Sequence, residues 1–199
     1  MPSAQQARTL LIATFLLIAP SMLHAENRKN AIEFGGLWTF VRFDSNAGIE
    51  SEFAPTAQLG FHFTRRHAAE LSLTTSTATA DSGGFKIDVD ILRAGYTYNA
   101  YPRERFVSFF RAGVGMMSLH PEDDPDASSR LNSSDHQLMA YGGAGLRIFF
   151  NDMIAFRIDG TVDFVESGDG FAHADVQATG GMGIVVVLGG TDETPAPTP

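Results

Sequence analysis

A strict alternation of apolar and polar residues over residues 137–163 is the feature that most constrains the fold of this chain. Every even-numbered residue at positions 138–150 and 154–162 is apolar or glycine. The intervening odd positions carry the charged side chains Arg147, Arg157, Asp159 and Asp163. A period of two places the two sets on opposite faces of extended strands. Residues 151–153 (Asn-Asp-Met) interrupt the period with turn-forming side chains, so the stretch is predicted to be a β-hairpin.

The chemistry of the two faces favours a membrane over water. Each strand is long enough to span a membrane, since about ten residues of a tilted strand suffice. The polar face carries Arg, Asp, Gly and Tyr, whereas the polar face of a soluble sandwich is usually rich in Lys and Glu. In a transmembrane barrel the apolar face meets lipid, and the polar face lines a narrow interior where charges must pair. We therefore predict an inverted, membrane-spanning arrangement.

The composition of the 199 residues fits this interpretation. The hydrophobic content is 44%, yet the mean hydropathy is only −0.02, because apolar and polar residues are interleaved. The length suits a single domain. The net charge of −9 argues against a nucleic-acid partner, which would normally require a basic face. The lack of cysteine indicates only that disulfides are not used.

The two ends of the chain differ from the alternating middle. Residues 1–25 are predicted to be a secretory signal peptide, with Arg8 as its positive charge, an apolar core at residues 10–19 and Ala25 as the last residue removed. The core is too short for a spanning helix, which needs about 20 apolar residues. Residues 191–199 are rich in proline and are predicted to be a disordered tail, which leaves residues 26–190 as the barrel domain.

Eight segments have the alternation expected of strands. They are predicted at residues 31–41, 56–64, 68–77, 86–99, 106–118, 137–150, 154–163 and 175–188. The connections between them alternate between long (42–55, 78–85, 119–135, 166–174) and short (65–67, 100–105, 151–153). Long external loops and short periplasmic turns are the rule for bacterial outer-membrane barrels. The predicted fold class is all-β, an eight-stranded antiparallel up-and-down transmembrane β-barrel.

The strand predicted at 86–99 is the least regular. Its second half alternates well, but Ile87, Val89 and Ile91 lie in the phase of the interior, with acidic residues between them. We expect either a β-bulge near Ile91 or a first half that projects above the membrane. Aromatic residues gather near the predicted short turns, where they should form the inner aromatic girdle: Phe63, Tyr98, Tyr101, Phe106, Phe149 and Phe150.

The charged residues on the inward phase balance each other. They are four arginines and four acids, namely Arg93, Arg111, Arg147 and Arg157 with Glu33, Glu70, Asp159 and Asp163. An interior of about eight strands is just wide enough to be filled by side chains. Unpaired charge would be costly there, and an arginine facing lipid at mid-membrane would cost roughly 2–4 kcal/mol. We predict that these eight residues form a structural network inside the barrel.

Three motifs resemble a known family. They are Tyr-Thr-Tyr-Asn at 96–99 before a proline turn, Phe-Phe-Arg-Ala-Gly-Val-Gly at 109–115, and Tyr-Gly-Gly-Ala-Gly-Leu-Arg at 141–147. Over residues 31–188 the chain resembles the bacterial outer-membrane β-barrel family, the OmpA-like or opacity-type eight-stranded domain. It departs from many members in closing its last strand on Leu188 rather than on an aromatic residue, and we expect no peptidoglycan-binding domain after the barrel.

The resemblance implies an integral protein of the bacterial outer membrane with a structural, adhesive or protective role. Its expected partners are outer-membrane lipid, including lipopolysaccharide, and the barrel-assembly machinery during insertion; an extracellular partner is not identified. We expect no enzymatic activity, no cofactor and no metal. A narrow barrel filled by salt bridges is also expected to be closed, although a small pore gated by exchange of ion-pair partners is an alternative.

Two other functions are open at this stage. Some eight-stranded outer-membrane barrels modify lipids through a Ser-His pair near the outer rim, as an acyl hydrolase of lipid A or phospholipid does. Ser118 and His120 share a face here, while His62 is predicted inside and His136 and His173 in or beside loops. A soluble lipocalin-like barrel is the other alternative. It would place four arginines on a glycine-rich outer surface.

The acidic stretch at residues 121–126 is a candidate cation site, because hard cations prefer clustered oxygen ligands. It lacks spaced ligands and a closing bidentate glutamate, so a solvated external loop is the preferred interpretation.

Overall fold

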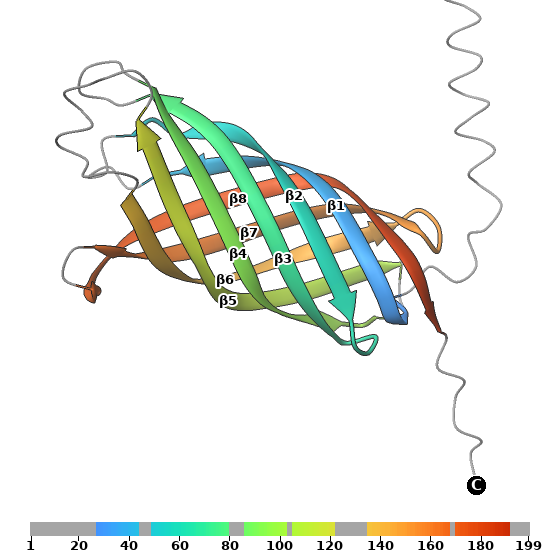
Figure 1. Cartoon of the computed structure of the whole chain (residues 1–199). Helices are drawn as coiled ribbons and strands as arrows, with labels where there is room; N and C mark the ends of the chain where they lie inside the picture. Colours follow the sequence, from blue (N-terminus) through green and yellow to red (C-terminus); the bar gives the residue numbers. More distant parts are fainter. Residues whose placement is uncertain are drawn as a thin grey trace, which may run out of the picture.

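The computed structural model describes residues 27–43, 49–79, 86–102, 105–121, 135–167 and 170–191. These residues form one closed antiparallel barrel in which each strand pairs with its neighbours in sequence and β1 pairs with β8 (Figure 1). The strands are β1 (Lys29–Arg42), β2 (Glu52–His62), β3 (His67–Thr79), β4 (Lys86–Ala100), β5 (Phe106–Pro121), β6 (Asp135–Phe149), β7 (Ile154–Ser167) and β8 (Gly170–Thr191). The predicted fold class is confirmed. Within the described residues, no helix is long and apolar enough to cross a membrane.

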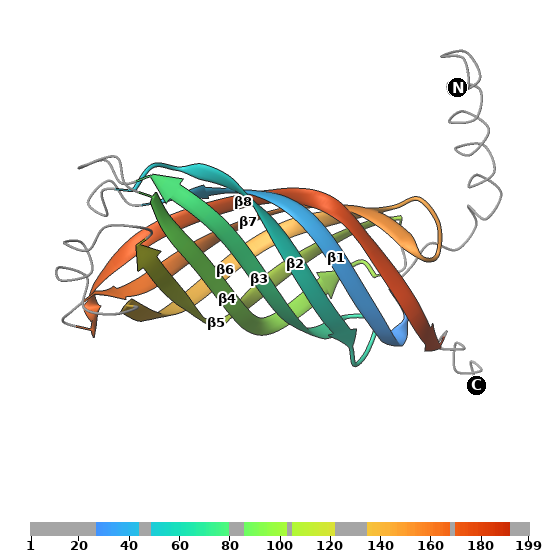
Figure 2. The same cartoon turned by 45° about the horizontal axis from the view of Figure 1, so that its top comes forward.

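The connections β2–β3, β4–β5 and β6–β7 lie at one end of the barrel, which we call the turn end (Figure 2). The first residue of β1, Lys29, and the last residue of β8, Thr191, are paired at the same end. Two of these turns are held by side chains. The backbone N–H groups of Arg66 and His67 donate to Thr64 Oγ1, and those of Met153 and Ile154 donate to Asn151 Oδ1. Such local hydrogen bonds allow Thr and Asn side chains to stabilise turns. The opposite end is the loop end.

Closure of the barrel satisfies the hydrogen-bonding groups of the strand backbones. The alternation of side chains then decides whether each residue points inward or outward. All eight strands exchange ladder hydrogen bonds with two neighbours, so the barrel has no free edge to place in hydrocarbon. Large apolar side chains point outward and form an exposed belt, in which Trp38 is 57% and Val114 is 67% exposed. Burying an apolar belt of this kind in water-free hydrocarbon is what stabilises a barrel in a membrane.

The interior is arranged in three layers along the barrel axis. An apolar layer fills the loop end and consists of Val41, Phe43, Ala54, Ala78, Ile87, Val89, Ile91, Met117, Met139 and Val165. A second apolar layer fills the turn end and consists of Ala31, Val107, Phe149, Ala155, Val185 and Val187. Most buried charged and polar side chains lie between the two, while Asn27 and Arg65 are buried at the turn end, where Asn27 Nδ2 donates to the Arg65 carbonyl. The charged network therefore has an apolar cap on each side.

The expected bulge near Ile91 is wrong. β4 pairs with β3 and with β5 in one continuous register, and its inward phase runs unbroken from Ile87 to Asn99. Ile87, Val89 and Ile91 are buried in the loop-end layer. What changes along β4 is therefore the chemistry of the interior and not the phase of the strand. The acidic residues between them are half-buried and point away from the interior, above the apolar belt.

The strands also extend further than predicted. β7 continues to Ser167 and β8 begins at Gly170, so the expected long loop at 166–174 is mostly strand. The irregularity that was expected in β4 occurs here instead, as a register shift between Val165 and Ser167. Thr191 belongs to β8, whereas the predicted signal peptide at 1–25 and residues 192–199 of the predicted tail lie outside the described residues. Phe149, expected in the aromatic girdle, is buried inside the barrel.

The exposed belt predicts a position-dependent response to charge. Val114→Arg at the middle of β5 should lower the free energy of unfolding by about 2–4 kcal/mol, because the guanidinium would face hydrocarbon. Thr75→Arg is a matched control: Thr75 is exposed and pairs with Asp90 beyond the belt, so its substitution should change stability by less than about 0.5 kcal/mol. Urea unfolding in lipid vesicles measures both. Equal costs would place Val114 outside the hydrocarbon.

Candidate functional site

The middle layer of the barrel contains all eight charged residues expected inside. Glu33 lies on β1, Glu70 on β3, Arg93 on β4, Arg111 on β5, Arg147 on β6, and Arg157, Asp159 and Asp163 on β7. Each is on the inward phase of its strand, and together they make two groups of ion pairs. The larger group joins six residues through Arg157, and the smaller is the pair of Arg93 and Asp163.

Arg157 is the centre of the larger group. Its Nη1 lies 3.0 Å from Glu70 Oε2 and 3.3 Å from Glu33 Oε1. Its Nε lies 2.6 Å from Asp159 Oδ2, and its Nη2 donates to Glu70 Oε1 at 3.1 Å. The fork of donors on a guanidinium allows one arginine to bridge several carboxylates. Arg157 has no solvent exposure, so these carboxylates replace the water that it loses on folding.

Arg111 extends this group toward the loop end. Its Nη1 lies 2.9 Å from Glu70 Oε1, and its Nη2 lies 2.9 Å from Asp159 Oδ1. It also donates to the hydroxyl of Thr161. Glu70 and Asp159 are therefore each shared between two arginines, and no carboxylate in this part of the interior depends on a single partner.

Glu33 extends the group in the other direction. Its Oε1 lies 3.1 Å from Arg147 Nη2 and accepts a hydrogen bond from Gln58 Nε2 at 2.9 Å. Its Oε2 lies 3.2 Å from His62 Nε2. Arg147 donates in turn to Asn99 Oδ1 at 2.6 Å. Uncharged amides thus provide some of the hydrogen bonds that a buried ion needs besides its counter-ion.

Arg93 and Asp163 form a separate pair. The arginine Nε and Nη2 donate to the two carboxylate oxygens at 2.9 and 2.7 Å, in the bidentate geometry. The pair connects β4 to β7 across the barrel, and both side chains are almost fully buried. Among the described residues it makes no ion pair or hydrogen bond with the Arg157 group, so it is the part of the interior that can be altered most independently.

Several members of the site were not singled out from the sequence. Phe109 is fully buried, and the guanidinium carbons of Arg147 and Arg157 lie 4.6 and 4.3 Å from the centre of its ring. Both guanidinium groups thus make a cation–π contact with the same ring. Gln58, Asn99 and His62 were on the inward phase but were not assigned to the network. The alternation alone would have found all four.

A glycine makes room for this ring. A Cβ atom at Gly145 would lie within 2.7 Å of Asp159 Cβ and would also collide with Phe109. Gly145 is on the inward phase of β6, opposite Asp159 on β7. The small residue therefore lets the large side chains of neighbouring strands cross the narrow interior, which explains why glycine is frequent on the inward face.

Little space is left in the middle layer. The cavity lined by Thr39, Gln58, Arg93, Arg111 and Asp159, among others, has a volume of about 10 Å³, which is room for at most about one water molecule. Side chains therefore fill most of the charged layer around this cavity.

A second, smaller arrangement lies on the outside at the loop end. Ser118 Oγ is 2.8 Å from His136 Nδ1, and the two residues are opposite each other on β5 and β6. Asp90 is opposite Ser118 on the other side. His120, expected to share a site with Ser118, is not hydrogen-bonded to it and is opposite Asp88 on β4. Among the described residues no cluster of acids or histidines could hold a metal ion. The acidic residues 122–126 and the side chain of His173 lie outside the described residues.

Comparison with solved structures finds the same architecture in bacterial outer membranes. The outer-membrane protein OprG from Pseudomonas aeruginosa superposes with a TM-score of 0.58 at 12% identity, over 82% of this chain and 98% of that chain. The N-terminal barrel domain of OprF from the same organism gives 0.53 at 13% identity, over 81% and 99%. Neisserial surface protein A gives 0.57 at 9% identity, over 78% and 95%. This chain has the fold of an eight-stranded outer-membrane β-barrel.

The likeness is one of fold. No protein-family model matches the chain, and no curated protein matches it in sequence. The predicted resemblance to eight-stranded outer-membrane barrels is confirmed at the level of structure, and the predicted location in the bacterial outer membrane agrees with it. At sequence identities of 9–13%, the similarity concerns the fold and does not assign the functions of these proteins to this chain.

The separate Arg93–Asp163 pair allows a direct test of charge pairing. Arg93→Met or Asp163→Leu alone should lower the free energy of unfolding by about 3–5 kcal/mol, because each leaves a buried charge unpaired. The double variant should cost much less than the sum, because it removes both charges. Urea unfolding in vesicles, followed by the fluorescence of the single tryptophan, measures the three values.

Arg42→Met is the control for loss of an arginine as such, since Arg42 is exposed at the loop end. It should change stability by less than about 0.5 kcal/mol. Additive costs for Arg93→Met and Asp163→Leu would show that the two groups do not stabilise each other.

Proposed function

We propose that this protein is a closed barrel of the bacterial outer membrane with a structural and surface-interaction role. In this proposal the Arg-carboxylate network locks the barrel shut, the apolar belt anchors it in lipid, and the loop end faces the exterior. The three outer-membrane proteins with the same fold support the location. The main support for a closed barrel is its filled interior, in which a cavity of about 10 Å³ lies between two apolar layers.

The layering argues against a pore gated by exchange of ion-pair partners. Exchange would require Glu70 or Asp159 to leave one arginine for another, and both are already shared between Arg111 and Arg157. Moving one carboxylate would still leave the apolar layers in place. Ions cross such apolar constrictions poorly, because they would lose their hydration shell.

The proposed partners follow from the location. Outer-membrane lipid, including lipopolysaccharide, would surround the belt, and the barrel-assembly machinery would act on the chain during insertion. An extracellular partner would meet the loop end. Its described charged residues are mostly acidic, with Glu50, Glu52, Asp88, Asp90, Glu166 and Asp175 against Arg42 and Lys86. A partner with a basic surface would complement this rim.

Planar bilayers test the closed state. The purified barrel should insert without producing stepwise ion currents, and it should migrate differently on a gel before and after boiling, which shows that it is folded. A variant that removes side chains from the loop-end layer, Ile91→Gly with Met117→Gly, should remain closed, since the charged layer still fills the middle. Discrete conductance steps from the unaltered, heat-modifiable protein would overturn the proposal.

A second candidate function is hydrolysis of lipid acyl esters, and the contact between Ser118 and His136 favours it. The pair lies one rung beyond Leu92, Met116 and Leu138 on the outer face. In the proposed membrane position this level would lie near the ester groups of the lipids. In such a reaction His136 would take the proton of Ser118 Oγ as the oxygen attacks the ester carbonyl. The alcohol would leave with that proton, and water would then release the fatty acid from the acyl-serine.

Lipid analysis separates the two candidates. Vesicles of phosphatidylethanolamine and phosphatidylglycerol are incubated with the refolded protein, and free fatty acid and lysophospholipid are measured by mass spectrometry. The structural role predicts no release. Release that is lost in both Ser118→Ala and His136→Gln, but not in the control His67→Gln at the turn end, would establish the hydrolase instead.

A further inference from the structure

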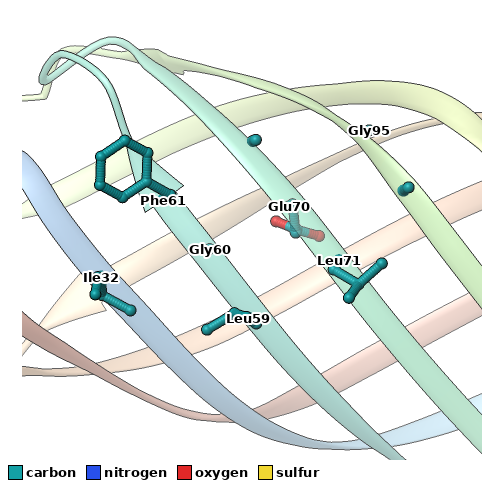
Figure 3. A pocket seen from close by; sticks show the side chains of 9 residues that line it. Ile32, Leu59, Gly60, Phe61, Glu70, Leu71 and Gly95 are labelled. Carbon is teal, nitrogen blue, oxygen red and sulfur yellow. The ribbon is translucent and has the colours of Figure 1, made fainter.

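The belt is hollowed on one side. A groove with a volume of about 420 Å³ lies over β1 to β4, and its lining is almost entirely apolar (Figure 3). Its walls are Ile32, Leu59, Phe61 and Leu71, and its floor is made by small residues. Ala69 is one of these: it is exposed, and it lies between Phe61 on β2 and Tyr96 on β4. Glu70, although it borders the groove, belongs to the charged interior.

A polar cluster lies at the turn-end side of this groove. One rung below Ala69, His67 pairs with Tyr98, and Nη1 of Arg66 donates to the Tyr98 hydroxyl at 3.2 Å. The His67 ring stacks on Tyr96, 5.8 Å between centres, and its Nδ1 is hydrogen-bonded to the Tyr96 hydroxyl. Arg66 is exposed. Its guanidinium is thus held by Tyr98 on the turn-end side of the groove.

We infer that the groove and this cluster together bind one anionic phospholipid of the periplasmic leaflet. An acyl chain would lie in the groove, and the phosphate would be held by Arg66 with the hydroxyl of Tyr98. The inference rests on the proposed function for its orientation, because the turn end must face the periplasm. The groove lies within the belt, and the cluster lies at its edge. A lipid bound here would have its acyl chain against the apolar groove and its anionic headgroup against the cationic cluster.

The charge of the turn end favours an anionic headgroup over a zwitterionic one. Its described charged residues are mainly basic, with Arg28, Lys29, Arg65, Arg66 and Arg105 against Asp152. A cationic residue near a membrane surface gains from anionic lipid. The loop end is acidic and has the opposite preference. A second copy of this chain is a poorer occupant, since the two Arg66 side chains of a symmetric pair would approach each other.

Native mass spectrometry measures the site directly. The full barrel is purified in detergent micelles that contain equal amounts of phosphatidylglycerol and phosphatidylethanolamine, and the fraction that keeps one lipid is recorded. The unaltered protein should retain phosphatidylglycerol about fivefold more than phosphatidylethanolamine. Arg66→Gln should remove this preference. Ala69→Phe, which fills the floor of the groove, should reduce retention of both lipids.

Two matched variants control for these changes. Arg42→Gln removes an exposed arginine at the loop end, and Ala144→Phe adds a ring to the exposed face of β6, which does not border the groove. Both should behave like the unaltered protein. Equal retention in all five proteins, or a loss shared by the controls, would show non-specific surrounding lipid and overturn the inference.

The gel assay distinguishes this failure from failure of the proposed function. A barrel that is heat-modifiable and non-conducting but has no lipid preference refutes the lipid site alone. A conducting barrel refutes the closed state whatever its lipid preference.

Discussion

Four guanidinium groups within a membrane-spanning barrel persist only if carboxylates stay within hydrogen-bond distance of them. The interior offers no bulk water, so the desolvation of each arginine must be offset by paired charge and by amide or hydroxyl partners. Glu70 meets Arg111 and Arg157, and Glu33 meets Arg147 and Arg157. These contacts join β1, β3, β5, β6 and β7 across the barrel. A register shift of one residue in any of these strands would point a charged side chain toward lipid. The ion pairs therefore favour the native register, and the native register brings the ion pairs together.

The apolar layers give this network its environment. Coulomb attraction weakens as water enters, so a charged layer open to solvent at either end would hold the strands less firmly. Here Val89, Ile91 and Met139 cover one side, and Val107, Phe149 and Val187 cover the other. The cost of carrying charge inside is thus confined to one level of the barrel. In the closed state proposed above, the same layers would also block the lumen, so a stable interior and a non-conducting interior would have one physical origin.

Alternation predicted most of the fold because it reports the face of each residue directly. The eight strands, the short turns and the inward position of all eight charges follow from a period of two, which a closed antiparallel barrel preserves around its circumference. The errors arose where a second rule was added. Assuming a wholly polar interior made the apolar inward residues of β4 look like a bulge and placed Phe149 outside. The layering of the interior has no signature in a period of two.

The partners of each interior side chain could not be predicted from the sequence, for a different reason. The phase shows that Arg93 and Asp163 both face inward, but it does not show that these two meet while Arg111 selects Glu70 and Asp159. Partner choice depends on the stagger between strands and on where glycines such as Gly145 leave space. Ser118 and His136 were likewise separated by a predicted loop, and only the pairing of β5 with β6 brings them together.

The balanced charge of the interior leaves the net charge of the barrel to its two ends. Because four arginines offset four carboxylates in the middle layer, that layer contributes little net charge, and the polarity of the barrel comes from its rims. The described turn end is basic and the described loop end is acidic. The two surfaces of a bacterial outer membrane differ in lipid, so a barrel with unlike rims gains more in one orientation than in the other. Orientation, lipid preference and the choice of an outer partner can thus be altered at the rims without disturbing the charges that hold the barrel closed.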